Sequence, residues 1–295
     1  MPMKSTAQVS VPATSGNVGP GFDVLGLALE LRDTVSVVVN DEPGVRVRVS
    51  GEGAASLPTD ESHLVARVLL EGLETLGVEV TGVDIHCENR IPQGKGLGSS
   101  AAAIVAGLSL AQLLVEDEVD LAWILEQATA YEGHPDNAAA CIYGGLTLAW
   151  SAQGQGAQSL VVLPEVKPVV AIPGEALLTE KARGLLPESV PLADAAFNAG
   201  RTGLVIIGLT QDISVLLEAT DDKLHQGYRR DAYPNSLQLV EDLRSAGIPA
   251  CISGAGPAVL ALTVSSTTDL AQRIVSEANF KAMPVDVSAQ GIVAE

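Results

Sequence analysis

The chain has 295 residues, with 36 Asp and Glu against 17 Lys and Arg, which gives a formal net charge of −19 at pH 7. This charge repels nucleic acid and anionic lipid, and no basic run is longer than two residues, so neither nucleic acid nor a membrane is expected as a partner. The length is enough to bury a large core and suggests two domains.

The cysteines and the N-terminus indicate a reducing compartment. Cys87, Cys141 and Cys251 are far apart and lack metal-ligand spacing, so we expect buried, reduced thiols. The opening MPMKSTAQVS has no apolar core of signal-peptide length, and no uncharged apolar run reaches the roughly 18 residues that cross a bilayer. We therefore expect a cytoplasmic protein.

The first regular elements expected along the chain are two strands. Residues 34–40 and 45–49 flank the turn at 41–44, and Val45, Val47 and Val49 alternate with arginines. This pattern predicts a β-hairpin at the start of a half-buried sheet.

A helix, a strand and two further helices follow. Apolar residues between Leu64 and Leu76 fall on one helical stripe, and Val83, Ile85 and Cys87 alternate with polar residues as in a strand. The next helix is predicted to begin at Ser99, and another follows an N-cap at Asp120. The glycine-rich stretch at 94–98 therefore joins a strand to a helix.

The stretch SAQGQGAQS, residues 151–159, is small, polar and without periodicity. It predicts a junction near residue 155, between domains at 1–155 and 156–295. Beyond it we expect strands at 161–163 and 169–172, a strand pair within 252–262, and helices at 192–209, 212–219, 236–246 and from Asp269 onward.

The glycine-rich stretch itself predicts a phosphate-binding loop. Its glycines at 94, 96 and 98 allow a close approach to the main chain, and Ser99 and Ser100 stand where an N-cap and first turn are expected. The first amides of a helix have no internal partner and attract anions. The loop matches neither the Walker nor the Rossmann signature, so a tight turn entering a core helix remains the alternative.

Three further segments carry residues that a plain core does not need. Asn17 and Asp23 border a Gly/Pro-rich break at 15–21, where turn and cap roles are the alternative to a site. Four polar residues crowd the turn at 132–137, more than one helix cap explains. Gly254 and Gly256 interrupt a strand pair, which indicates a bulge or a close backbone approach.

These segments resemble, in order, three motifs of the GHMP small-molecule kinases. The matches are PATSGNVGPGFD at 12–23, PQGKGLGSSAA at 92–102 and SGAGPAVLAL at 253–262. The opening motif, EGHPDN at 132–137 and LHQGYR at 224–229 are similar to the homoserine kinase branch of that family. The resemblance implies an α+β fold with two domains, the first like domain 2 of ribosomal protein S5 and the second ferredoxin-like. It also implies in-line transfer of the γ-phosphate of ATP to the side-chain hydroxyl of L-homoserine, in threonine biosynthesis.

The resemblance also implies binding sites for ATP and Mg²⁺. Magnesium is expected on the Ser100 hydroxyl and the Glu132 carboxylate, hard oxygen ligands that suit this ion. His63 stands where many family members carry Asn, which leaves the adenine contacts open. The residues expected around ATP are Pro92, Gln93, Gly94, Lys95, Gly96, Leu97, Gly98, Ser99, Ser100, Ala101 and Ala102.

The implied substrate pocket holds a zwitterion. Arg201 and Arg229 are expected to bind the carboxylate, for which a planar guanidinium is suited. The expected substrate-binding residues are Asn17, Asp23, His134, Asp136, Arg201 and Arg229, and those expected to take part in catalysis are Asn17, Asp23, Asp136 and Arg201. Asp136 either holds the ammonium or takes a proton, because phosphoryl transfer requires no strong base.

Two alternatives to this function are a GHMP kinase acting on another small alcohol and a regulatory homologue without activity. Intact Lys95, Ser100 and Glu132 argue against the second. The resemblance further suggests a homodimer. His225 lies within the LHQGYR match, as either a core or a cleft residue, and His86 is expected to be an ordinary solvated side chain on a strand.

Overall fold

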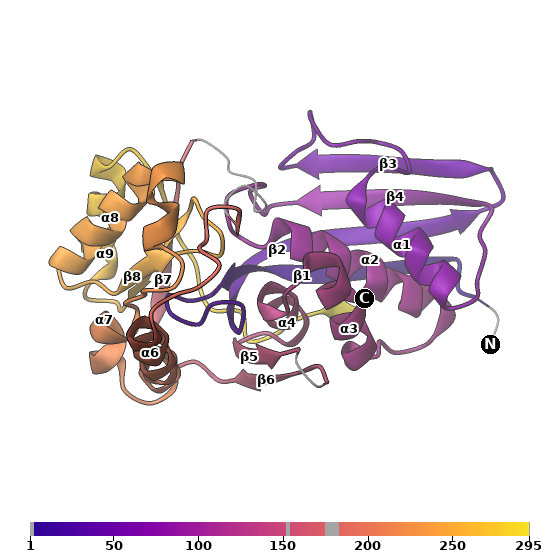
Figure 1. Cartoon of the computed structure of the whole chain (residues 1–295). Helices are drawn as coiled ribbons and strands as arrows, with labels where there is room; N and C mark the ends of the chain where they lie inside the picture. Colours follow the sequence, from indigo (N-terminus) through magenta and orange to yellow (C-terminus); the bar gives the residue numbers. More distant parts are fainter. Residues whose placement is uncertain (1–2, 152–153, 175–182, 295) are drawn as a thin grey trace.

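Two β-sheets organise the chain, and the computed structural model describes residues 3–151, 154–174 and 183–294 of it. Within these residues the first sheet has seven strands and the second has four. Figure 1 shows the two sheets side by side, each with its own helices. No helix in the described part of the chain is long and apolar enough to cross a membrane. The three cysteines are free and buried, as predicted.

The first sheet has the strand order β11-β1-β2-β4-β3, and β5 pairs with β2 and with β6. Its inward-facing residues build the larger core, in which Val9, Val35 and Ile85 are almost completely buried. Its strands are β1 (Thr6–Gly16), β2 (Leu25–Asn40), β3 (Gly44–Gly51), β4 (Gly82–Asn89), β5 (Leu146–Trp150), β6 (Gly156–Leu160) and β11 (Val293–Ala294).

The predicted hairpin between β2 and β3 is wrong, although both strands exist. β4 lies between them, antiparallel to β2 and parallel to β3, with Val45 of β3 opposite Val83 of β4. β4 buries Val83, Ile85 and Cys87, so it suits an internal position, whereas β3 fully buries only Val47 and suits an edge. Alternation along a strand identifies the strand but does not choose its partner.

Four helices cover one face of the first sheet (Figure 1). They are α1 (Leu64–Thr75), α2 (Ser99–Val115), α3 (Leu121–Glu132) and α4 (Asp136–Tyr143). α2 is buried along most of its length between β1 and the other helices, which explains why its sequence is apolar all round. The predicted cap is confirmed, because the Asp120 carboxylate accepts hydrogen bonds from the amides of Ala122 and Trp123 at 3.0 and 3.1 Å.

The second sheet has the order β10-β7-β9-β8 and carries the remaining helices. α8 and α9 pack against its strands, as Figure 1 shows. The predicted helices and the strands around 169–172 and 252–262 are confirmed, but residues 161–163 are not a strand, and Val161 is exposed. The elements are β7 (Lys167–Ile172), β8 (Ala250–Ile252), β9 (Val259–Thr263), β10 (Lys281–Pro284), α6 (Leu192–Thr210), η1 (Ile213–Val215), α7 (Leu216–Ala219), η2 (Gly227–Ala232), α8 (Pro234–Ser245) and α9 (Thr268–Glu277).

The passage from one sheet to the other falls between β6 and β7. β6 forms within the stretch predicted to be irregular and pairs with β5, with Gly156 opposite Trp150. A Cβ on Gly156 would lie 2.3 Å from the Trp150 ring, so the ring packs there only because residue 156 has no side chain. The same lack of a side chain weakens the strand pattern in the sequence. The end of the chain also returns to the first sheet, where β11 pairs with β1. A division at residue 155 into separate folding units stays a prediction.

Candidate active site

A cavity of about 600 Å³ lies where the segments singled out in the sequence meet. One end is formed by the glycine-rich loop and the start of α2, and the other by the loop after β1, the start of α4 and two arginines. The polar residues that line it are, in chain order, Asn17, Asp23, Asp33, His63, Asn89, Gln93, Ser99, Ser100, Tyr131, Glu132, His134, Asp136, Asn137, Arg183 and Arg229.

The glycine-rich loop has a backbone that only glycine adopts without strain. Gly94, Gly96 and Gly98 have φ values of 64°, 78° and 70°. A Cβ on Gly96 would lie 2.3 Å from the Ser253 carbonyl oxygen, and one on Gly98 would lie 1.9 Å from the Thr14 hydroxyl. The loop is therefore pressed against β1 and the 253–257 turn, and its shape is fixed before any ligand binds.

The third glycine motif supports this loop from behind. The Ser253 hydroxyl donates a hydrogen bond to the Gly96 carbonyl at 2.7 Å, and the Ala258 amide donates to the Lys95 carbonyl at 2.9 Å. The Gly254 amide donates to the Gly16 carbonyl at 3.0 Å. The close backbone approach predicted for residues 252–262 is confirmed, and it joins the second sheet to the loop.

The helix α2 begins at the cavity, and among the described residues no capping side chain binds its first amides. Its N-cap is Gly98, one residue before the predicted Ser99, and glycine supplies no capping side chain. The first amides of this 17-residue helix are thus left to a ligand, and the helix dipole favours an anion there. Ser99 and Ser100 line the cavity, whereas Leu97 and Ala101 are buried in the core.

The residues expected to hold Mg²⁺ lie together beside the loop. The Ser100 hydroxyl donates a hydrogen bond of 2.6 Å to the Glu132 carboxylate at the end of α3. One hydroxyl and one carboxylate at the mouth of a phosphate site are hard oxygen ligands, so the residues present fit the ion. The Lys95 ammonium donates to the Gly174 carbonyl at 2.7 Å, and Lys95 is not among the residues that line the cavity.

His63 is a buried donor along the same cavity. Its Nδ1 accepts from the Val65 amide at 3.3 Å and caps α1, so its proton lies on Nε2. Burial lowers the pKa of His63, which keeps the ring neutral. Nε2 has no hydrogen-bond partner among the described residues, so it is an orphaned polar atom that an acceptor on a bound ligand would satisfy.

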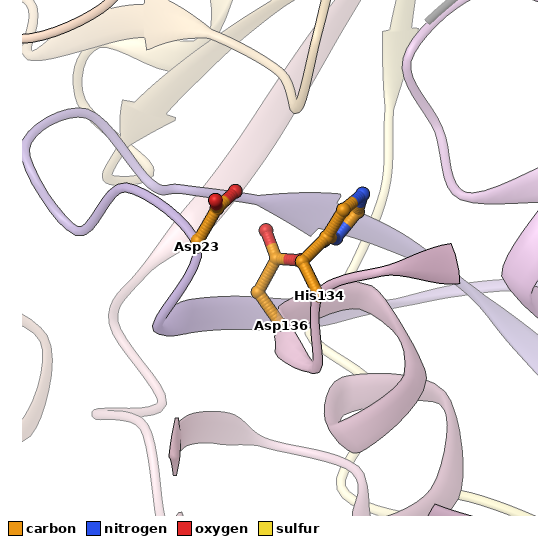
Figure 2. Close-up of side chains that lie close together, drawn as sticks. All are labelled: Asp23, His134 and Asp136. Carbon is orange, nitrogen blue, oxygen red and sulfur yellow. The ribbon is translucent and has the colours of Figure 1, made fainter. Parts of the chain in front are cut away.

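At the other end, three acid–base side chains face one another. Figure 2 shows Asp23, from the loop after β1, beside His134 and Asp136 at the start of α4. One candidate ligand atom from each lies within 4.8 Å of the others. Asp23 and Asn17 both have left-handed backbones, with φ values of 59° and 67°, a conformation that Asn and Asp tolerate better than most residues.

Hydrogen bonds fix this cluster before a substrate binds. The Asn17 side chain accepts from the Asp23 amide at 3.0 Å and donates to the Gly254 carbonyl at 2.9 Å. Asp136 accepts from the Asn17 amide at 3.2 Å and lies 2.6 Å from the His134 ring. Burial acts to lower the pKa of His134, but the hydrogen bond and charge of Asp136 outweigh it and raise that pKa.

The electrostatics suit a small zwitterion. Two carboxylates, Asp23 and Asp136, provide the negative side. Arg183 and Arg229 provide the positive side, and their guanidinium carbons lie 5.5 and 5.8 Å from the centre of the Phe22 ring. Arg183 forms two hydrogen bonds to the Asp23 carboxylate, at 2.5 and 3.2 Å. A guanidinium already bound to Asp23 indicates that this carboxylate is shaped for a cationic group with N–H donors.

Arg183 lines the cavity but was not among the site residues predicted from the sequence, which named Arg201 and Arg229. Arg201 is on α6, where its guanidinium lies 4.7 Å from the centre of the Phe197 ring, and it does not line the cavity. The side of α6 that meets the loop after β1 is formed by Asn198 and Thr202, whose side chains donate to the Pro20 carbonyl. Arg183 lies in a stretch without periodicity, so no local signal distinguished it.

Comparisons with known proteins agree with this architecture. Residues 63–145 match the GHMP kinases N terminal domain, and residues 207–282 match the GHMP kinases C terminal domain. The chain is thus a GHMP kinase in class. The predicted α+β fold with two domains of this type is confirmed.

The chain belongs to the homoserine kinase family of the GHMP kinases. It is 51% identical to the homoserine kinase of Streptomyces avermitilis, over 92% of this chain and 90% of that protein, and 49% identical to that of Clavibacter michiganensis, over 86% and 82%. The crystal structure of homoserine kinase from Cytophaga hutchinsonii superposes with a TM-score of 0.87 at 30% identity, covering 100% of this chain and 99% of that one.

Proposed function

We propose that this protein transfers the γ-phosphate of ATP to the side-chain hydroxyl of L-homoserine and so forms O-phospho-L-homoserine for threonine biosynthesis. The observation that carries the proposal is the single cavity with a phosphate loop at one end and paired opposite charges at the other. Homoserine has a carboxylate, an ammonium and a primary hydroxyl, and this cavity offers a partner for each.

The end of the cavity formed by the glycine-rich loop and α2 would promote transfer by aligning the reactants and stabilising charge. In the transfer, the homoserine hydroxyl oxygen bonds to the γ-phosphorus while the bond from that phosphorus to the β–γ bridging oxygen breaks. Since the transition state is loose, the protein's main tasks are alignment and charge stabilisation. The first amides of α2 would bind the phosphates. Ser100 and Glu132 would hold Mg²⁺, which would neutralise part of the phosphate charge.

The carboxylates Asp23 and Asp136 hold the substrate ammonium. Asp136 already accepts hydrogen bonds from Asn17 and Asn137 and contacts His134, so its carboxylate is held in one orientation in the cavity that it lines. Phosphoryl transfer depends mainly on alignment and requires no strong base. We therefore assign Asp136 an orienting role and expect the hydroxyl proton to leave to water or to a phosphate oxygen.

The arginines hold the substrate carboxylate. Arg229 is 1% exposed and lines the cavity. Arg183 pairs with Asp23 in this structure, and an incoming ammonium competes for that carboxylate. Once displaced, the Arg183 guanidinium, which lines the same cavity, would bind the carboxylate of the same substrate, for which its planar fork is suited.

A matched pair of variants tests the arginine assignment. Arg183→Ala is expected to lower kcat/KM for L-homoserine and to leave KM for ATP nearly unchanged. The expected loss of transition-state stabilisation is ~2 kcal/mol or more, which is the usual cost of removing one partner of a charge pair. Arg201→Ala is expected to stay within a few-fold of the wild type, because Arg201 lies outside the cavity. The reverse pattern would restore the assignment made from the sequence.

A substrate panel separates the alternatives. ADP release from MgATP is measured with L-homoserine, D-homoserine, mevalonate, shikimate and galactose. Turnover limited to L-homoserine supports the proposal, turnover of another alcohol supports a different GHMP kinase, and ATP binding without turnover supports a regulatory role. The fold does not decide between these, since a mevalonate diphosphate decarboxylase from Enterococcus faecalis shares it with a TM-score of 0.71 at 15% identity.

The homodimer, the cytoplasmic location and the absence of nucleic-acid and membrane partners remain predictions. The first is tested by the mass of the protein in solution.

A further inference from the structure

One buried histidine, His225, connects the two charged sides of the substrate pocket. It is fully buried, and it lies outside the groups that the proposed reaction uses. Its Nε2 is 2.7 Å from the Gly19 carbonyl oxygen, and its Nδ1 is 3.2 Å from a terminal nitrogen of Arg229. A carbonyl only accepts and a guanidinium only donates, so Nε2 carries the proton and Nδ1 accepts.

This tautomer requires a neutral ring. Burial lowers the pKa of His225 and outweighs the opposing charge of Asp222, which keeps the ring neutral near pH 7. A second proton would sit on Nδ1 and face the Arg229 cation. The neutral ring is therefore the only form that serves both partners.

The turn that carries His225 is itself held firmly. The Asp222 carboxylate accepts hydrogen bonds from the amides of Leu224, His225 and Gln226 at 2.8 to 3.0 Å, and from the Asn198 side chain at 2.8 Å. These bonds fix the backbone from which the His225 ring projects. The ring position is thus set by the second domain and not by the loop it contacts.

On its other side, His225 contacts the loop that carries the ammonium-binding residues. Gly19 lies between Asn17 and Asp23 in this loop, and a Cβ on Gly19 would be 2.9 Å from the Thr220 carbonyl oxygen, so the loop is seated closely on the second domain. The Phe22 ring is 5.4 Å from the His225 ring, centre to centre, at an interplanar angle of 30°. His225 therefore meets this loop at two points and Arg229 at a third.

We infer that His225 is a positioning residue for the substrate, which holds Arg229 and the 17–23 loop at a fixed separation so that both ends of one amino acid are bound together. The inference rests on the proposed function, because it assigns Arg229 to the carboxylate and the loop to the ammonium. A merely structural histidine would support folding but would not govern how strongly the amino-acid substrate binds.

Three substitutions separate the two hydrogen bonds. His225→Gln places an amide near Nε2 and retains a donor for Gly19 but loses the acceptor for Arg229. His225→Asn places an oxygen near Nδ1 and retains the acceptor but does not reach Gly19. His225→Phe keeps an aromatic ring at this position but loses both hydrogen bonds. His86→Gln, on β4 and away from the cavity, is the matched control.

The measurement is steady-state ADP release, with KM determined separately for L-homoserine and for MgATP. Losing a hydrogen bond to a charged group predicts about a tenfold or greater rise in KM for L-homoserine in His225→Gln, and a larger rise in His225→Phe. KM for MgATP should stay within about twofold of the wild type in both variants, and His86→Gln should match the wild type. A rise confined to homoserine is the result that a folding role alone does not produce.

A double-variant cycle tests the connection through Arg229. If His225 acts by holding that guanidinium, the double variant Arg229→Lys/His225→Gln should raise KM for L-homoserine by clearly less than the product of the two single-variant rises. Independent, multiplying effects would overturn the inference, as would an unchanged homoserine KM in His225→Phe or equal rises for homoserine and MgATP. Lack of homoserine turnover in the wild type would instead refute the proposed function, so the two failures are distinguishable.

Discussion

Substituting Gly98 by alanine should damage both the fold and the phosphate site, and the structure gives the size of the effect. Gly98 has a φ of 70°, a conformation that costs a non-glycine residue roughly 1–2 kcal/mol. The added Cβ would lie 1.9 Å from the Thr14 hydroxyl. Thr14 is fully buried, its hydroxyl donates to the Asn137 side chain at 2.9 Å, and its amide donates to the Leu97 carbonyl at 3.0 Å.

Thr14 cannot move aside without leaving one of these buried groups unpaired, which costs a further ~1–3 kcal/mol. The sum predicts that Gly98→Ala lowers the free energy of unfolding by about 2–5 kcal/mol. KM for MgATP should rise as well, because Gly98 is the N-cap of α2.

The matched control is Gly77→Ala. Gly77 has a similar φ of 75°, but its Cβ would meet nothing within 4 Å, so only the backbone term of roughly 1–2 kcal/mol remains. Urea unfolding followed by tryptophan fluorescence gives both values, and ADP release gives the two KM values for MgATP. Equal destabilisation of the two variants, with equal KM for MgATP, would refute the argument that the loop is sterically locked against β1.

Two further predictions concern the metal site and a buried carboxyl group. Glu132→Gln should raise the Mg²⁺ concentration that gives half-maximal rate by ~10-fold or more, because losing even a residue that only supports a metal ligand weakens metal binding by that factor. An unchanged Mg²⁺ dependence would remove Glu132 from the site. Burial raises the pKa of Asp33 to about 6, against the hydrogen bonds from the Arg90 and Ile91 amides, so the folded state holds this proton more tightly than the unfolded chain does. Stability should therefore fall as pH rises from about 4 to about 6, by roughly 3 kcal/mol from this group alone. Asp33→Asn should lack this component, and parallel curves of unfolding free energy against pH for the variant and the wild type would contradict the assignment.

The sequence by itself determined the elements whose signals are local. The apolar stripe of α1, the Asp120 cap of α3 and the alternation in β4 each depend on neighbouring residues, and all three were predicted. The glycine-rich loop before α2 belongs to the same group, since glycines before an unbroken helix are recognisable without knowing what lies opposite. The order of the three glycine motifs was enough to assign the family, because these backbone requirements permit few other residues.

Only the tertiary structure decided which distant segments meet. The position of β4 between β2 and β3 depends on how much surface each strand buries, which alternation does not encode. Arg183 reaches Asp23 across 160 residues of chain, and His225 reaches Gly19 across 206. The family resemblance pointed to Arg201 through its matching segment, and no such match pointed to Arg183. Charge pairing and side-chain direction are set by packing between the two domains, and they determine which arginines line the cavity.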